Sequence, residues 1–343
     1  MTQLSSSIKI GNKICKNRIV MPPLVCFNWA DEEGIETVSR ADHYGERNDT
    51  GLIVIEAVGI SKESRIISTE LGIWSEKHIK QFANTAKACH EKDALVVVQI
   101  VHAGIKAYPE HVFAPTCIEA EGKHVQELTP EMIHQIKDDF INAAIRAKEA
   151  GLDGVEVHGA HGYLLNQFTS SKSNQRNDCY GGSTANRYKL SADIVTAIRN
   201  KVGNDFIISY RFGVNDPTFE DDITGIKLLE DVGVDLFNVS SGIGIQSLDV
   251  PEDYPESFIT YMGYKMKQHT SKPVVSVFGI KTPEQAQNLL ENNFTDLVAI
   301  GRGLLADPKW SKKALNNEDV NICYHCKPRC QFVIDGHNCP QKS

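Results

Sequence analysis

Short apolar runs alternate with amphipathic stretches along most of the chain. Eight of the runs are rich in Val, Ile and Leu, which is typical of strands that are buried on both faces of a parallel sheet. These predicted strands are Arg18–Leu24, Gly51–Ala57, Ala94–Ile100, Gly154–His158, Phe206–Phe212, Leu236–Ser240, Pro273–Gly279 and Leu297–Gly301.

Helix signals fill the intervals between the predicted strands. Thr129 and Pro130 have the residue types of an N-cap and a first helical position, and the helical pattern after them runs to about Gly151. Thr282 is followed by proline in the same way, and the helical segment Asn186–Val202 follows the fourth strand. Eight strand–helix alternations with right-handed crossovers close most simply into a (β/α)8 TIM barrel. An open, doubly wound sheet is disfavoured because no Gly-x-Gly-x-x-Gly follows the first strand.

The predicted organisation is one barrel domain over residues 1–318 and a short Cys-rich C-terminal tail over residues 319–343. The chain has 343 residues, of which 41% are hydrophobic and 23% charged, as in globular proteins with a sizeable core. A net charge of −8 argues against nucleic acid and against an anionic membrane as partners. No apolar run reaches membrane-spanning length and the polar start lacks a signal-peptide core, so we expect a cytoplasmic protein.

The stretch from Gly154 to Tyr163 carries the densest group of chemically active side chains. A short buried strand ends there in a loop that contains His158, His161 and Tyr163. In a barrel of parallel strands, the catalytic groups follow the C-terminal ends of the strands, so we expect the active site here. The alternatives are a pair of core or zinc-ligand histidines and a tyrosine that only packs.

Other predicted strands end in residues that could bind a ring or an anion. Gln99 offers an amide donor and acceptor, and Arg211 offers a permanent positive charge that would suit an electron-rich ring. Glycines after the seventh and eighth strands and a neighbouring arginine are the parts of a barrel phosphate site: Gly279, Gly301 and Arg302. The long segments 101–128 and 159–183 follow strands three and four, where they would form the substrate pocket.

Five motifs occur in the order known from one enzyme family. They are Arg18-Ile-Val-Met-Pro-Pro-Leu24, Gln99-x-x-His102-Ala-Gly104, His158-x-x-His161-Gly-Tyr163, Tyr180-Gly-Gly-Ser183-x-x-Asn186-Arg187 and Ile300-Gly-Arg302. Together they resemble the Old Yellow Enzyme family of FMN-containing ene-reductases of the NADH:flavin oxidoreductase type. The resemblance covers about residues 5–310, and the pair of histidines resembles the bacterial branch.

The resemblance implies a bound FMN that is reduced by NAD(P)H and passes hydride from its N5 atom to an activated C=C bond of an enone or nitroalkene, or reduces a quinone. The residues implied to hold the flavin ring are Pro23, Leu24, Ala57, Gln99 and Arg211, and those implied to hold its phosphate are Gly279, Gly301 and Arg302. His158 and His161 would polarise the substrate's carbonyl or nitro group, and Tyr163 would protonate its α-carbon. Relatives often form dimers or tetramers, so the resemblance allows this chain to form a homo-oligomer.

One position departs from the family pattern. Val25 stands where relatives often have Thr or Cys beside the N5/O4 edge of the flavin. Because valine cannot donate a hydrogen bond to the flavin, we expect a shifted redox potential. Cys26 is one residue further along, and the flavin-tuning role does not transfer to it.

Four cysteines crowd the C-terminal tail: Cys323, Cys326, Cys330 and Cys339. Their thiols are soft ligands at metal-like spacing. They resemble the tail of the branch that contains 2,4-dienoyl-CoA and bile-acid reductases, which implies a [4Fe–4S] cluster. A structural zinc site and reduced, metal-free thiols are the alternatives.

Two other functions compete with the ene-reductase hypothesis. One is a flavin dehydrogenase or dienoyl reductase-like enzyme that passes electrons through an iron–sulfur tail. The other is a flavin-binding stress or regulatory protein with incidental reductase activity. Stoichiometric iron and sulfide would favour the first, and failure to turn over enones, nitroalkenes and quinones would favour the second.

Overall fold

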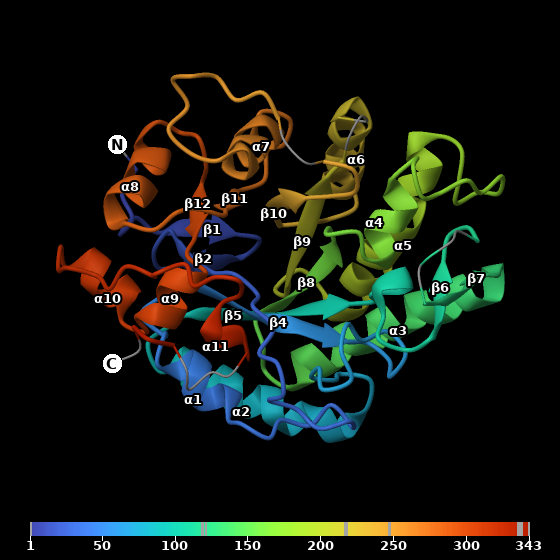
Figure 1. The fold of residues 1–343 in the computed structure, drawn as a ribbon, viewed down its shortest axis with the longest axis horizontal. Helices are drawn as coiled ribbons and strands as arrows, with labels where there is room; N and C mark the ends of the chain where they lie inside the picture. Colours follow the sequence, from blue (N-terminus) through green and yellow to red (C-terminus); the bar gives the residue numbers. More distant parts are fainter. Residues whose placement is uncertain are drawn as a thin grey trace.

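Eight parallel strands close into a barrel in the computed structural model, which describes residues 2–117, 120, 122–215, 219–245, 248–334 and 339–341 (Figure 1). The strands follow one another around the barrel in chain order: β3 (Ile19–Met21), β4 (Leu52–Gly59), β5 (Leu95–Val101), β8 (Gly154–Gly159), β9 (Ile207–Val214), β10 (Leu236–Ser241), β11 (Val274–Val277) and β12 (Leu297–Ala299). All eight lie within or overlap the predicted segments, so the (β/α)8 TIM-barrel prediction is confirmed.

Helices surround the barrel strands (Figure 1). They are α1 (Arg40–Gly45), α2 (Ile79–His90), α3 (Pro130–Glu149), α4 (Leu164–Thr169), α5 (Thr184–Val202), α6 (Phe219–Asp231), α7 (Phe258–Lys267), α8 (Pro283–Glu291), α9 (Arg302–Ala306) and α10 (Trp310–Leu315), with α11 (Gln331–Ile334) in the tail. The hydroxyl of Thr129 caps α3 as predicted, and Thr282 forms a capping box with Gln285 at α8. Helix α5 begins two residues before the predicted start because Ser183 accepts a hydrogen bond from the Asn186 N–H and caps it.

Three strands are shorter than predicted. Strand β3 ends at Met21 because the two prolines that follow have no N–H to donate to a neighbouring strand. Strand β11 ends at Val277, where Phe278 adopts a φ of 87° that is incompatible with an extended strand. Strand β12 ends at Ala299, two residues before the predicted limit at Gly301, which is the N-cap of α9.

Two small sheets were not predicted. Strands β1 (Ile8–Ile10) and β2 (Lys13–Cys15) form an antiparallel hairpin near the N-terminus. Ile10 and Cys15 pack in one apolar cluster with residues at the beginnings of the barrel strands, so the hairpin closes the N-terminal end of the barrel. Strands β6 (His111–Ala114) and β7 (His124–Glu127) pair in the long segment after β5.

The C-terminal tail packs against the barrel domain. Phe332 of α11 is 2% exposed, and its ring centroid lies 5.9 Å from Trp29 and 5.6 Å from His43. All three are residues of the N-terminal region or the tail, so the two ends of the chain share one core. No helix in the described ranges is long and apolar enough to cross a membrane.

Candidate active site

Three aromatic side chains meet at the C-terminal end of β8. The ring centroid of His158 lies 5.0 Å from that of His161 and 4.9 Å from that of Tyr163, and both pairs meet edge to face. His161 reaches this position with a φ of 59°, a rare conformation for a residue other than glycine. Its backbone N–H donates to the carbonyl of Ser241 at 3.0 Å, which fixes the turn. The predicted catalytic trio is thus brought together.

His158 is held as a neutral imidazole with a defined proton position. The backbone N–H of Ala160 donates to Nδ1 of His158 at 3.3 Å, so Nδ1 is an acceptor and the ring proton lies on Nε2. Burial first, and then the proximity of His161 and Arg211, lowers the pKa of His158 well below its ordinary value. His158 therefore offers one N–H donor without carrying a charge.

His161 is also neutral at physiological pH. Burial and then the charges of Arg211 and Lys106 lower its pKa to about 3. Its Nε2 lies 2.8 Å from Oγ of Ser240, a residue of β10. If Ser240 donates to Nε2, Nδ1 of His161 carries the proton that can be donated to a ligand.

Tyr163 is a protonated phenol beside the two imidazoles. Burial and then the charge of Glu70 raise its pKa to about 12. Lys106 lies above the phenol ring at 5.7 Å from its centroid, and its Nζ donates to the carbonyl of His161 at 2.6 Å. The ammonium group thereby ties the segment after β5 to the loop after β8.

Arg211 lies on the neighbouring strand at the same height as His158, since the two residues are register partners across β8 and β9. Arg211 is 5% exposed, and its Nε and Nη1 atoms have no hydrogen-bond partner among the described residues. Burial lowers the pKa of Arg211, although the charge of Glu156 opposes that effect. A buried guanidinium with free donors requires an electron-rich ligand, and the pyrimidine edge of a flavin fits this requirement.

Two other predicted flavin contacts are adjacent to each other. Ala57 on β4 and Gln99 on β5 are register partners, next to a β-bulge between Ile55 and Ala57. The amide Nε2 of Gln99 donates to Oε1 of Glu156 at 2.8 Å. The other end of the Gln99 amide is left for a ligand.

The predicted phosphate glycines follow β11 and β12, which are paired in the barrel. Gly279 has a φ of 86°, a conformation that favours glycine. A Cβ atom at Gly301 would lie 3.4 Å from Pro22 and 3.7 Å from Leu24, so the turn after β12 adjoins the segment after β3. The turns after β11 and β12 and the segment after β3 therefore lie at one side of the barrel mouth, where the phosphate of FMN is expected.

The sequence of residues 3–321 matches the NADH:flavin oxidoreductase / NADH oxidase family. The chain belongs to this family. The match confirms the resemblance to the Old Yellow Enzyme family, while the assignment to the bacterial branch with two histidines stays a prediction.

Individual relatives agree with this assignment. The NADH oxidase of Thermoanaerobacter brockii is 35% identical over 346 residues, which cover 95% of this chain but 53% of that protein, so the chain spans about half of its length. The NADPH dehydrogenase of Listeria innocua is 34% identical over 330 residues. The matched region covers 92% of this chain and 94% of that protein. A solved old yellow enzyme homologue from Zymomonas mobilis is 26% identical with a TM-score of 0.80, and 94% of each chain is covered. The protein is thus an FMN-dependent NAD(P)H oxidoreductase of the old yellow enzyme type.

Val25 and Cys26 differ in their surroundings in this flavin oxidoreductase. Val25 is half-buried next to Leu24, whereas Cys26 is buried. The Cys26 N–H donates to Oε2 of Glu56 at 2.9 Å, and its thiol contacts the Leu24 carbonyl at 3.6 Å. Cys26 therefore contacts the carboxylate of Glu56, whose other oxygen forms a buried ion pair with Nε of Arg40 at 2.7 Å.

The four tail cysteines line one small enclosed space together with Arg302 and Phe332. All four are free and half-buried. Over the ranges that the structure describes, no three His, Cys, Asp or Glu side chains are arranged to hold a metal ion. The structure thus brings the four thiols to one place beside the predicted phosphate arginine without forming a ligand set.

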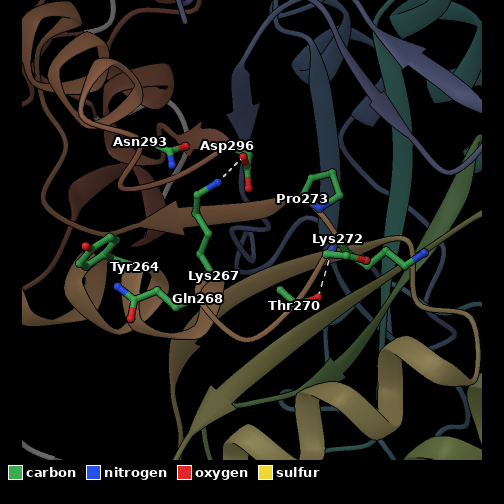
Figure 2. A pocket seen from close by; sticks show the side chains of 9 residues that line it. Tyr264, Lys267, Gln268, Thr270, Lys272, Pro273, Asn293 and Asp296 are labelled. Atoms are coloured by element: carbon green, nitrogen blue, oxygen red, sulfur yellow. Dashed lines mark hydrogen bonds and ion pairs between the residues drawn. The ribbon is translucent and has the colours of Figure 1, made fainter.

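An open hollow of about 410 Å³ lies at the opposite end of the barrel (Figure 2). Pro273 and Asp296, which precede β11 and β12, form part of its wall. Lys267 points toward Asp296 in Figure 2 and forms an ion pair with it at 2.5 Å. Because these residues precede their strands, the hollow lies away from the strand ends that carry His158 and Arg211.

Three residues of the candidate site were missed in the sequence: Lys106, Glu156 and Ser240. Ser240 ends a predicted strand, so the rule for strand ends could have identified it. Glu156 is a charged residue inside an apolar strand, two positions before His158, and this parity places both on the same side of the strand. Lys106 gave no signal, because its position depends on how the segment after β5 folds.

Proposed function

We propose that this flavin oxidoreductase reduces C=C bonds that are activated by a carbonyl or nitro group, and that it also accepts quinones. The observation that carries the proposal is the meeting of His158, His161 and Tyr163 beside the buried guanidinium of Arg211, whose Nε and Nη1 have no hydrogen-bond partner among the described residues. Two neutral donors, one phenol and one cation are the groups that reduction of a polarised alkene requires next to a flavin.

The two imidazoles would bind the oxygen of the activating group. Neutral N–H groups stabilise the negative charge that develops on this oxygen, as the donors of an oxyanion hole do. Nε2 of His158 is available for this role because Nδ1 already accepts from Ala160. His161 would supply the second donor while Ser240 holds its ring.

Tyr163 would donate the proton that completes the reduction. A pKa of about 12 keeps the phenol protonated throughout the physiological range. The proton goes from the phenol oxygen to the α-carbon of the substrate. FMN, when bound, supplies the hydride chemistry between NAD(P)H and the β-carbon.

The remaining predicted residues would hold the cofactor. Arg211 and Gln99 would contact the polar edge of the ring, next to Ala57 and the backbone of Pro23 and Leu24. Gly279, Gly301 and Arg302 would contact the phosphate. The free donors of Arg211 and the free end of the Gln99 amide support these roles.

An anaerobic spectral titration tests the proposed reaction. FMN-loaded protein is mixed first with NADPH or NADH and then with cyclohexenone. We expect the flavin absorbance to bleach and then to return as the enone is consumed. Bleaching without recovery by an enone, a nitroalkene or a quinone would contradict the proposal and favour an electron-relay or regulatory protein. Failure of the protein to take up FMN would contradict the proposed reaction and also these two alternatives.

A second proposal concerns an iron–sulfur cluster in the tail. It rests on the cysteine spacing and on one space that is lined by Cys323, Cys326, Cys330 and Cys339, although the described residues form no ready ligand set; four thiolates are the usual ligands of a [4Fe–4S] cluster. Anaerobically purified protein should then contain about four iron ions and about four acid-labile sulfide ions per chain, the content of one cluster. Zinc without sulfide would indicate a structural zinc site. Neither metal would leave the cysteines as reduced thiols.

A further inference from the structure

Four polar side chains form a continuous layer inside the barrel. They come from four successive strands: Gln99 on β5, Glu156 on β8, Ser209 on β9 and Asn238 on β10. Gln99 is 2% exposed and the other three are completely buried. The interior layers of such barrels usually consist of Val, Ile and Leu, so this layer requires a physical reason.

Glu156 is the centre of the layer. Its Oε1 accepts from Nε2 of Gln99 at 2.8 Å. Its Oε2 accepts from Oγ of Ser209 at 2.9 Å and from Nδ2 of Asn238 at 3.0 Å. Three donors thus satisfy both oxygens of one buried carboxylate.

The layer adjoins Arg211 at the mouth of the barrel. Asn238 and Arg211 are register partners across β9 and β10, and His158, the other register partner of Arg211, lies two residues after Glu156. The charge of Glu156 acts on Arg211, where it opposes the effect of burial. Glu156 is thus the anionic counterpart of a guanidinium that has no direct hydrogen-bond partner at two of its nitrogens within the described ranges.

We propose that Glu156 is a positioning residue that sets both the affinity for FMN and its reduction potential. The inference rests on the proposed FMN site and assigns a function to a residue that does not itself contact the cofactor.

The first effect acts through Gln99. An amide presents an acceptor at one end and donors at the other, and the two ends exchange when the group flips. Because the carboxylate of Glu156 accepts from Nε2, only one orientation of Gln99 is favourable, and Oε1 faces away from Glu156. A fixed amide presents the same hydrogen-bonding edge to every flavin that binds, which lowers the entropic cost of binding.

The second effect is electrostatic. Reduction adds negative charge to the flavin, and the positive charge of Arg211 favours it. The carboxylate of Glu156 offsets part of this charge in a buried site where screening by water is weak. Removing the negative charge should therefore make the reduction potential more positive.

Two substitutions separate the two effects. Glu156→Gln removes the charge but keeps an oxygen that can accept from Gln99. The new amide can be accommodated, because the Oδ1 atom of Asn238 has no partner in the described structure and can accept from it after a flip. Glu156→Asp keeps the charge but withdraws the carboxylate by one methylene from Gln99.

The experiment compares the midpoint potential and the dissociation constant of FMN in the holoenzyme and its variants. We expect Glu156→Gln to favour reduction by about tenfold, which is about 30 mV for a two-electron couple, with little change in affinity. We expect Glu156→Asp to weaken FMN binding by roughly tenfold, from the loss of one charge-assisted hydrogen bond, with a smaller change in potential. Ser209→Ala is the matched control, because it removes a hydrogen bond to Glu156 and leaves both the charge and Gln99 in place; its potential should equal that of the unmodified protein.

The outcomes distinguish this inference from the proposed function. If the unmodified protein binds no FMN, the proposed function fails, and the inference with it. If it binds FMN and Glu156→Gln leaves the potential unchanged, or shifts it to a more negative value, the inference alone is overturned. Circular dichroism checks that each variant is folded, and if Glu156→Gln does not fold, Glu156→Asp still tests the effect on affinity.

Discussion

Oγ of Ser240 lies 2.8 Å from Nε2 of His161, although the two residues belong to segments that are separated by a whole barrel strand. The hydroxyl fixes the orientation of a ring whose backbone is in a rare conformation. Replacing it should free the ring without changing the local fold.

Ser240→Ala should lower the turnover of an enone by roughly tenfold, because one hydrogen bond in a buried site contributes about 1–1.5 kcal/mol. Reduction of the flavin by NAD(P)H should change little. Stopped-flow measurement of both half-reactions checks the prediction. Ser241→Ala is the control, since His161 donates to the backbone carbonyl of Ser241 and this substitution leaves that carbonyl in place. Equal rates in the two variants would contradict a role for the hydroxyl.

Tyr163→Phe should slow the reoxidation of the flavin by an enone roughly a hundredfold, the usual contribution of one general acid. It should leave the reduction by NAD(P)H unaffected. Tyr108→Phe is a suitable control, because Tyr108 is 42% exposed in the neighbouring segment. A Tyr163→Phe enzyme that is reoxidised at the normal rate would mean that the proton comes from another donor or from water.

The buried histidines should lower the stability of the protein when the pH drops below about 6.5. Burial lowers the pKa of His102 to about 4 and is the main reason that the pKa of His161 is about 3. In the unfolded chain these groups bind protons near pH 6.5, but in the folded protein they do not. The free energy of unfolding is therefore unaffected by them above pH 6.5 and decreases below it, by about 1.4 kcal/mol per pH unit for each histidine.

Urea unfolding at pH 7.5 and pH 5.5 checks this dependence. His161→Gln should reduce the difference in unfolding free energy between these two pH values by about 1.4 kcal/mol, since one titrating group is removed. The exposed His134, replaced by Gln, serves as the control and should leave the difference unchanged. The same difference in all three proteins would contradict the buried, neutral state of His161.

Phe332→Ala should release the C-terminal tail from the barrel. The ring is buried against Trp29 and His43, and removal of a buried phenylalanine side chain typically costs about 3–5 kcal/mol. Because a short helix holds the ring, we expect local undocking rather than global unfolding. Limited trypsin digestion should then cleave within the tail much faster than in Ile334→Ala, whose side chain is 48% exposed. Equal cleavage rates would show that Phe332 does not anchor the tail.

Much of the site could be predicted because parallel strands bring their C-terminal ends to one edge. His158 and Arg211 were assigned to two different strand ends, and closure of the barrel makes them register partners. The contact of Lys106 with the His161 carbonyl could not be predicted, since it joins two irregular segments whose backbone follows no periodic pattern. The hydrogen bond from Gln99 to Glu156 likewise depends on the stagger between strands, which hydrophobic patterns do not specify.

The packing of the C-terminal tail is a second feature that the sequence did not predict. The spacing of its cysteines indicated a metal, but the burial of Phe332 against Trp29 joins residues some three hundred positions apart and has no local signature. In the part of the chain that the structure describes, the four cysteines line one space but form no metal-ligand set, and a bound metal stays a prediction.

The position of Glu156 also has a consequence for how the barrel assembles. Its partner Gln99 is in the first four strands, but Ser209 and Asn238 are in the last four. A fragment with only the first four strands would lack two of the three donors to this carboxylate, and a fragment with only the last four would lack the carboxylate itself. The two halves of this chain should therefore fold as one cooperative unit, and neither half should be stable when expressed alone.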